Sequence, residues 1–164
     1  MEKYNQLHLL IDTFDCEIMD KRKQFTEHEQ MVFDAVGKKF RREIFPAKDP
    51  YSRFDGQDED YIYEIKYRDT HYQHTLIEFD KFAFNQMYAN LTGREFIYCV
   101  GYDMGGYIKV FIFNISRLYL YDNPFHWEWR EMPLNSIFGK SEKTNKFVGY
   151  IDCKEAIKSI TIKT

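Results

Sequence analysis

The stretch Tyr61–Arg68 reads YIYEIKYR and decides the expected fold. It alternates in the way typical of a β-strand, in which every second side chain points to the same face of a sheet. One face carries Tyr61, Tyr63, Ile65 and Tyr67, and the other carries Ile62, Glu64, Lys66 and Arg68. Just before this stretch, residues 56–60 (GQDED) predict a polar turn, and residues 51–55 predict a short strand. The sequence therefore predicts a β-hairpin across residues 51–68.

This hairpin carries side chains that suit a divalent cation. Asp55 and Glu64, one from each expected strand, would supply carboxylates, and the backbone carbonyl of Ile65 would supply a further oxygen. Mg²⁺ is usually held by one or two carboxylates, with water and substrate as its other ligands. Lys66 leaves the same face as Glu64, where an ammonium orients water or stabilises developing negative charge. Such a cation also lowers the pKa of an attacking water, so the pattern favours phosphodiester hydrolysis.

Two other interpretations of the hairpin stay open. Alternating charge on a solvated strand face also produces Glu64 and Lys66 at this spacing. Asp58 and Asp60 compete with Asp55 as ligands if the turn is shorter than residues 56–60. Asp60 stands only a short turn before Glu64, which favours Asp55. The apolar and aromatic neighbours of this pair place the charges near a core, where charges need partners.

The surrounding elements predict an α/β sandwich with a mixed sheet. Thr26 and Glu29 form a capping box at the start of a helix that we expect to end near Arg42. A second helix is expected over residues 79–91, and two strands over 95–102 and 107–115 form a hairpin. Further short strands and a helical turn are expected in the C-terminal third. The segment up to residue 23 is compatible with either a helix or a strand.

Over residues 27–115 the chain resembles the PD-(D/E)XK nuclease superfamily, in which an aspartate after one strand precedes an E-x-K triplet in the next. Asp55 and Glu64-Ile65-Lys66 match these positions, although Phe54 stands where the family has a proline. The resemblance implies a restriction-endonuclease-like three-layer sandwich, with a central mixed β-sheet flanked by helices. It also implies an acid from the first helix at the metal, for which Glu29 fits better than Glu27. A basic residue from the next helix often assists, and Lys81 is the nearest candidate.

The expected function is therefore Mg²⁺- or Mn²⁺-dependent endonuclease cleavage of DNA, with Asp55, Glu64 and Lys66 as catalytic residues. Asp55, Glu64, Ile65 and Glu29 are the expected metal ligands. Expected phosphate contacts are Arg53, Arg68, Lys81, Lys38, Lys39 and Arg42. If the protein resembles the junction resolvases, it is expected to form a homodimer that cuts two strands. The alternatives are a catalytically inactive nucleic-acid- or protein-binding module on the same fold, and an unrelated α/β interaction protein with an aromatic surface.

Composition bounds these expectations. The chain has 164 residues, enough for one domain with its own core, so we expect a single domain over 1–164 with a core at about 26–115. A net charge of -3 argues against a general nucleic-acid coat protein but not against an enzyme with local basic patches. Cys16, Cys99 and Cys153 form no CxxC pair, which suits buried thiols in a reducing compartment. With no secretory signal and no apolar run of about 20 residues, a cytoplasmic protein without membrane contact is expected.

Other motifs carry less weight. His71 and His74 have a spacing seen in zinc sites, but a loop beside the active strand is the favoured interpretation because no further ligand accompanies them. His126 with Trp127 and Trp129 could form a base-stacking surface, whereas tryptophans that nearly alternate are more typical of a core. The expected turn after Gly101 precedes a strand and no helix, which excludes a phosphate loop there.

Overall fold

The computed structural model describes residues 25–49, 51–121, 124–133 and 142–164. The helices are α2 (Glu27–Phe40), α3 (Phe79–Thr92), α4 (Ile115–Tyr121) and the short 3₁₀ helix η1 (Cys153–Glu155). The strands are β1 (Phe45–Pro46), β2 (Gly56–Gln57), β3 (Tyr61–Arg68), β4 (His74–Glu78), β5 (Glu95–Asp103), β6 (Tyr107–Asn114), β7 (His126–Pro133), β8 (Lys143–Asp152) and β9 (Lys158–Lys163). The expectation for the segment up to residue 23, and Cys16, lie outside the described residues.

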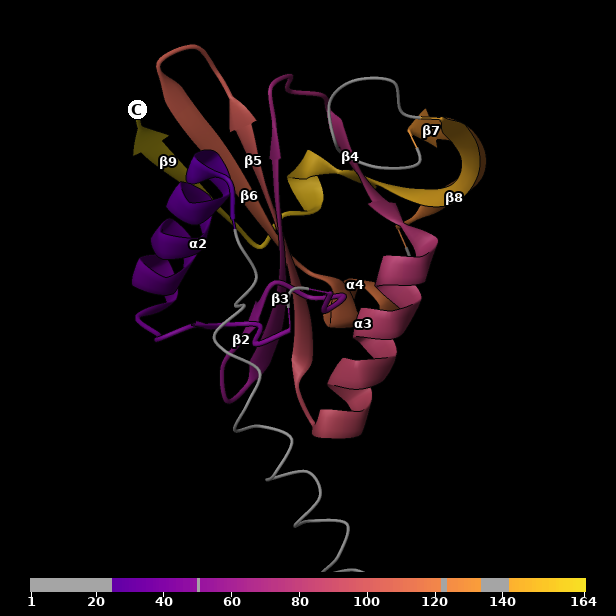
Figure 1. The fold of residues 1–164 in the computed structure, drawn as a ribbon, viewed down its shortest axis with the longest axis horizontal. Coiled ribbons are helices and arrows are strands. Elements are labelled where there is room, and N and C mark those ends of the chain that lie inside the picture. Colours follow the sequence, from indigo (N-terminus) through magenta and orange to yellow (C-terminus); the bar gives the residue numbers. More distant parts are fainter. Residues whose placement is uncertain (1–24, 50, 122–123, 134–141) are drawn as a thin grey trace, which may run out of the picture.

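A central sheet in the order β1-β2-β3-β5-β6-β9 organises the molecule (Figure 1). Its neighbours pair antiparallel except β3 and β5, which run parallel with Glu64 beside Tyr98. The sheet is therefore mixed, as the sequence predicted. A parallel pair needs a crossover connection, and the segment containing β4 and α3 supplies it. A second, antiparallel sheet has the order β4-β8-β7.

Helices cover both faces of the central sheet. Figure 1 shows α2 on one side of it and α3 with the second sheet on the other. Under α2 lies an apolar cluster that joins Val32 and Val36 to Tyr63 and Ile65 of β3. A second apolar cluster lies on the opposite face of the central sheet. It joins Phe82 and Ala89 of α3 to residues of β3, β5 and β8, namely Ile62, Tyr98 and Ile151. The fold is thus a mixed α/β arrangement compatible with a three-layer sandwich.

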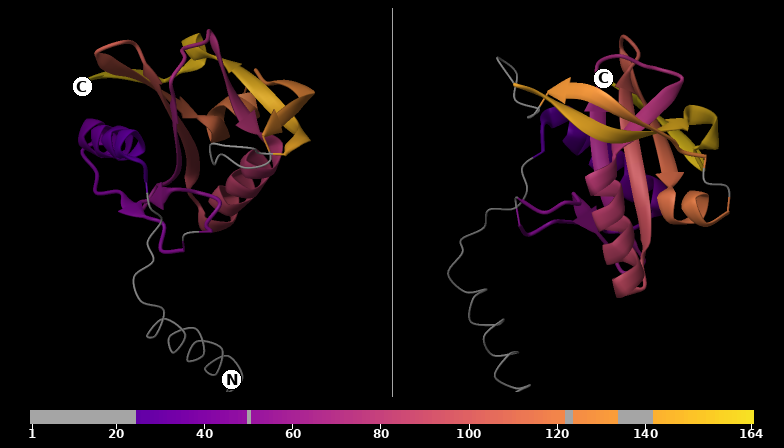
Figure 2. Two further views of the ribbon diagram at one scale, coloured as in Figure 1. Left: turned by 45° about the horizontal axis from the view of Figure 1, so that its top comes forward. Right: turned by 90° about the vertical axis from the view of Figure 1, so that its right-hand side faces the viewer.

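The second sheet lies beside the start of α3 (Figure 2). β4 leads directly into this helix and pairs with β8, with Ile77 opposite Gly149. Aromatic rings join the two elements, because Phe79 of α3 contacts Trp127 at 5.3 Å and Phe147 at 5.5 Å between ring centroids. This sheet therefore extends the layer of α3 and borders the same face of the central sheet.

Several sequence predictions are confirmed. The capping box of Thr26 and Glu29 is present at the start of α2, and α3 ends at Gly93 in the left-handed conformation. β5 and β6 form the expected hairpin, in which Gly105 (φ 72°) and Gly106 (φ 100°) adopt backbone angles that favour glycine. As a separate observation, none of the helices in the described part of the chain has the length and apolar composition needed to span a bilayer.

The first hairpin was predicted only in part. Residues 51–55 form no strand; instead Gly56–Gln57 pairs with β3, with Gln57 opposite Ile62. The physical reason is Asp58, whose carboxylate accepts the backbone N–H groups of Asp60 and Tyr61, both at 2.8 Å. This side chain closes a turn shorter than the one predicted over residues 56–60. The helix α4 and the strand β4 were not predicted.

Candidate active site

Asp55 lies against the edge of β3 at the point where the pairing of β3 with β2 ends. β2 pairs only with Ile62 and Tyr63, so the next positions of β3 have no strand on that side. The Asp55 N–H donates to the Tyr63 carbonyl at 2.7 Å, and Asp55 Oδ2 accepts the Ile65 N–H at 2.5 Å. With only 3% of its surface exposed, the Asp55 side chain is fixed against the backbone between Glu64 and Lys66.

Glu64 is the buried centre of a charge cluster whose two lysines are half-buried. It is 1% exposed, and its Oε1 atom lies 2.8 Å from Lys66 Nζ and 2.7 Å from Lys81 Nζ. Its second oxygen, Oε2, is buried and has no hydrogen-bond partner among the described residues. Leaving a buried carboxylate oxygen unsatisfied costs free energy. The Glu64 carboxylate therefore has one oxygen whose capacity to accept a ligand or a hydrogen bond is unused among the described residues.

The carboxylates of this cluster keep Lys66 protonated. Burial alone lowers the pKa of Lys66, but the charges of Glu64 and Asp55 outweigh burial and hold this pKa well above its ordinary value. Lys66 is thus an ammonium at neutral pH and lies within electrostatic reach of both carboxylates. Asp55 and Glu64 together with Lys66 and Lys81 balance to a net charge of zero.

Helix α3 joins the loop before Asp55 to the strand that carries Glu64. Lys81 donates to Glu64 and also lies 3.5 Å from the Arg53 carbonyl, which accepts from Asn85 Nδ2 at 3.4 Å. The Arg53 guanidinium is 2.7 Å from Asp80 Oδ2 and covers the Phe84 ring. The first turns of α3 thereby position the basic groups of this site. The structure brings together Asp55, Glu64, Lys66, Lys81 and the backbone of Ile65 and Arg53.

Glu29 is not part of this cluster. Its carboxylate accepts from the Thr26 backbone N–H at 3.1 Å and from the Thr26 hydroxyl at 3.0 Å, so it caps α2. That helix packs on the Tyr63 and Ile65 face of the sheet, opposite the face of Glu64. The placement does not support the expected role of Glu29 as a metal ligand. A capping-box glutamate next to an apolar helix face signals this outcome in the sequence.

Three of the expected phosphate-binding residues also lie elsewhere. Lys38 and Lys39 border a hollow between α2 and β9 on the α2 side of the sheet. Arg42 is engaged with the hairpin turn, at 2.6 Å from Asp60 Oδ2 and 3.7 Å from Asp58 Oδ1. These residues do not join the buried cluster. Arg68, by contrast, lies on the Glu64 face of β3 and lines a cavity next to the cluster.

The rival carboxylates on the turn have their own partners. Besides closing the turn, Asp58 accepts from the Tyr63 hydroxyl at 2.7 Å. Asp60 is exposed and pairs with Arg42. The shorter turn therefore does not bring either acid to Glu64 in place of Asp55.

The histidine and tryptophan motifs fall into different settings. His71 stacks on Phe111, whereas His74 belongs to β4 and lies 3.8 Å from Asp152. Trp127 packs on Phe82 and Phe125, in agreement with a core role, while Trp129 is 71% exposed. Sequence reasoning missed Thr75, Tyr102, Arg130 and Tyr150, which line the same cavity as Arg68. Their convergence depends on the pairing of β4 with β8, which no local pattern signals.

The donor set limits what this site can hold. In the part of the chain that the structure describes, no three His, Cys, Asp or Glu side chains are grouped around a common metal position. Within the described residues, this site therefore offers at most the two carboxylates of Asp55 and Glu64, with backbone carbonyls as additional oxygen donors. No protein-family profile, curated protein or solved structure that was compared with the chain matches it.

Proposed function

We propose that the protein is a Mg²⁺- or Mn²⁺-dependent nuclease that hydrolyses DNA, of the PD-(D/E)XK type, with Asp55, Glu64 and Lys66 as its catalytic residues. The observation that carries the proposal is the buried Glu64 carboxylate, which has one oxygen bound by two ammonium groups and the other without a partner among the described residues. The Asp55 carboxylate, which is fixed on the Ile65 N–H between Glu64 and Lys66 in sequence, would supply a second oxygen ligand. A restriction-endonuclease-like fold is part of the same proposal.

The donor chemistry fits a hard cation. Mg²⁺ prefers oxygen ligands and commonly uses one or two carboxylates, leaving its other positions to water and substrate phosphate. Asp55 and Glu64 would hold it, and the Ile65 carbonyl is the backbone group between them in sequence. When bound, the ion would lower the pKa of a water molecule and withdraw charge from the scissile phosphate. Because two ammonium groups already balance both carboxylates, we expect weak binding of the free ion and tighter binding when an anionic phosphate is present.

The lysines have an electrostatic role in this proposal. The raised pKa of Lys66 keeps it protonated, so it acts as a hydrogen-bond donor and a positive charge, and not as a proton acceptor. Preorganised positive groups stabilise the charge that develops on a phosphate during hydrolysis. Lys81 adds a second ammonium from α3, and Arg53 and Arg68 are nearby candidates for contacts with flanking phosphates. Lys38, Lys39 and Arg42 are not included.

Element order supports the type of site. A helix precedes the hairpin that carries Asp55 and Glu64, and a second helix and two further strands of the central sheet follow it. The strand with the E-x-K triplet is internal to the sheet, with β2 and β5 on its two sides. This element order supports the proposed PD-(D/E)XK type of site.

The test is a cleavage assay with Mn²⁺ and Mg²⁺ on linear, nicked, branched and single-stranded DNA. Asp55→Asn and Lys66→Met should each reduce the cleavage rate by about 10²–10³-fold, the range found when one preorganised charge-stabilising group is lost. Asp58→Asn is the matched control, because it removes a buried carboxylate from the same hairpin that has no contact with Lys66 or Lys81. Its rate per folded molecule should equal that of the wild type. Equal cleavage by Asp55→Asn and Asp58→Asn would reject the site.

The second candidate is a catalytically inactive binding module on the same fold. The balance of two carboxylates by two lysines favours it, since a buried ion-pair network can be purely structural. A calorimetric titration with Mn²⁺ separates the two functions. A nuclease should take up the ion in a way that depends on Glu64, whereas an inactive module should show the same response before and after Glu64→Gln.

A further inference from the structure

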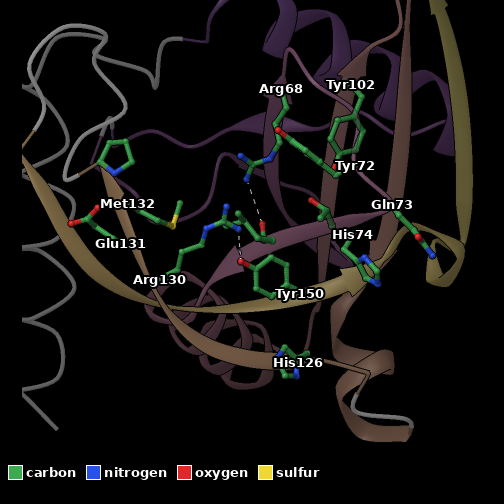
Figure 3. Close-up of a pocket in the computed structure, with 13 residues that line it drawn as sticks. Arg68, Tyr72, Gln73, His74, Tyr102, His126, Arg130, Glu131, Met132 and Tyr150 are labelled. Carbon is green, nitrogen blue, oxygen red and sulfur yellow. Dashed lines mark hydrogen bonds between the residues drawn. The ribbon is translucent and has the colours of Figure 1, made fainter.

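A cavity of about 720 Å³ lies between the central sheet and the second sheet. Figure 3 shows Arg68 entering from β3 and Arg130 from β7, together with Tyr72, His74, His126 and Tyr150. The cavity is therefore built by segments that are far apart in the sequence and meet only through the pairing of β4, β8 and β7. It is distinct from the cluster around Glu64, although Arg68 follows Lys66 on the same face of β3.

The walls of the cavity carry excess positive charge. Neither Arg68 nor Arg130 forms an ion pair with a carboxylate within residues 25–49, 51–121, 124–133 and 142–164. Arg130 Nη1 instead donates to the Tyr150 hydroxyl at 2.5 Å, while Arg68 contacts the Leu76 carbonyl at 3.5 Å and interacts with the Tyr98 hydroxyl. Glu131, which also lines the cavity, is neutralised by Lys143 at 2.8 Å. Both guanidinium groups thus retain capacity to bind an anion.

Buried polar atoms without partners lie in the same walls. Arg68 Nε, Thr75 Oγ1 and the Tyr102 hydroxyl are all buried and have no partner of hydrogen-bonding geometry in the described part of the chain, although the Tyr102 hydroxyl lies close to Thr75 and Cys153 and interacts with both. Thr75 is 1% exposed and Tyr102 is 0% exposed. Buried polar groups are normally satisfied, so a buried Arg68 Nε without a partner, beside two incompletely satisfied hydroxyls, points to a missing ligand on this cavity. A carboxylate offers two oxygens in one plane, whereas donors from three sides suit the tetrahedral oxygens of a phosphate.

Aromatic side chains complete the pocket. Tyr72 and Tyr150 line it, and the cavity is much larger than a phosphate ion alone requires. We propose that this cavity binds a nucleoside phosphate, whose phosphate is held by Arg68 and Arg130 and whose base packs on the tyrosine rings. The source is either a free nucleotide or the terminal nucleotide of a strand. This site goes beyond the proposed nuclease activity and needs neither the metal ion nor cleavage.

The test is calorimetry in EDTA, which prevents metal-dependent cleavage, with adenosine 5′-monophosphate and adenosine as paired probes. The nucleotide should bind about tenfold more tightly than the nucleoside, because hydrogen bonds to charged groups are the strong ones. Arg130→Gln should remove about tenfold of that affinity. Arg41→Gln is the matched control, since it makes the same charge change in an exposed arginine at the end of α2, and it should bind the nucleotide like the wild type.

Two further arms make the result specific. The first arm measures the binding of oligothymidylate with a 5′-phosphate and of the same strand with a 5′-hydroxyl. If the phosphorylated strand binds more tightly than the free nucleotide, the result supports the site and assigns it to strand ends. If the free nucleotide binds more tightly, the result supports the site and assigns it to free nucleotides. Tyr102→Phe removes an incompletely satisfied hydroxyl from the cavity wall, so it should weaken nucleotide binding without lowering the melting temperature of the free protein. Equal affinity for adenosine and its monophosphate, or unchanged binding by Arg130→Gln, overturns the proposal. Lys66→Met should bind the nucleotide normally, so loss of cleavage and loss of nucleotide binding are separable.

Discussion

The two faces of β3 differ sharply although their residues alternate in one strand. Under α2, Tyr63 and Ile65 are buried among apolar side chains. Toward α3, the buried Glu64 carboxylate pairs with the half-buried Lys66 ammonium, and Arg68 lines the neighbouring cavity. One face thus stabilises the fold and the other holds groups that are costly to bury without partners. The contrast shows that the two faces of β3 have different roles. Substitutions on the α2 face should therefore lower stability, whereas substitutions on the α3 face should mainly affect its charged and polar groups.

The largest expected effect comes from the apolar face. Ile65→Ala removes a side chain that is 1% exposed and leaves a cavity under α2, which should lower the free energy of unfolding by about 2–5 kcal/mol. The Ile65 backbone N–H that serves Asp55 is unchanged. Guanidinium unfolding curves measure the loss, with Thr161→Ala on exposed β9 as control. A loss as small as that of the control would contradict the assignment of this face to the core.

Close packing on the same face is tested at Gly101. A Cβ atom there would approach Val32 Cγ2 to 2.6 Å and Ile108 Cγ2 to 3.1 Å, which leaves no room for a methyl group between β5 and α2. Gly101→Ala should therefore destabilise the protein by about 1–3 kcal/mol, the usual cost of overpacking a core. Thermal unfolding gives the measurement. A stability equal to that of the wild type would mean that α2 can move away from β5 at no cost.

On the α3 side of the central sheet, the buried Tyr102 hydroxyl should make the stability of the protein depend on pH in alkaline solution. Burial raises the pKa of Tyr102 to about 12. Between the ordinary tyrosine value near 10 and that value, the unfolded chain loses this proton and the native state keeps it, so stability falls as pH rises. Tyr102 contributes at most about 1.4 kcal/mol per pH unit to this fall. Unfolding curves across this range should be less pH-dependent for Tyr102→Phe, and an unchanged slope would show that the hydroxyl reaches water.

The smallest effect is expected at the start of α2. Glu29→Ala breaks the capping box with Thr26 and should cost about 1 kcal/mol. Because the Glu29 carboxylate faces Thr26 and not Glu64, metal-dependent cleavage by the folded protein should be unchanged. The experiment combines a melting curve with the cleavage assay. A fall in cleavage comparable to that of Asp55→Asn would restore Glu29 as a metal ligand.

Local patterns predicted the local features well. The alternation of Tyr61–Arg68 gave the correct faces of β3, and the spacing of Val32, Phe33 and Val36 gave the buried side of α2. Asp55 contacts the backbone of the E-x-K triplet through the Ile65 N–H and lies within electrostatic reach of Lys66, because a hairpin keeps neighbours in sequence close in space. Their catalytic role stays a prediction.

Features that depend on distant pairing were not predictable in the same way. β4 is a short strand whose partner β8 lies far along the chain, so nothing near residues 74–78 signals the second sheet. The cavity lined by Arg68 and Arg130 was missed for the same reason. The displaced turn has a different cause, since a single carboxylate, that of Asp58, decides where the first hairpin reverses.

The two borders of the central sheet constrain how copies of this chain could assemble. An unpaired strand normally invites another chain to add to it. Here one border is β1, which has two residues and contains Pro46, and the other is β9, whose ends carry Lys158 and Lys163. Proline cannot donate to a neighbouring strand, and lysines repel a like copy. Edge-to-edge pairing of the central sheets of two copies is therefore disfavoured.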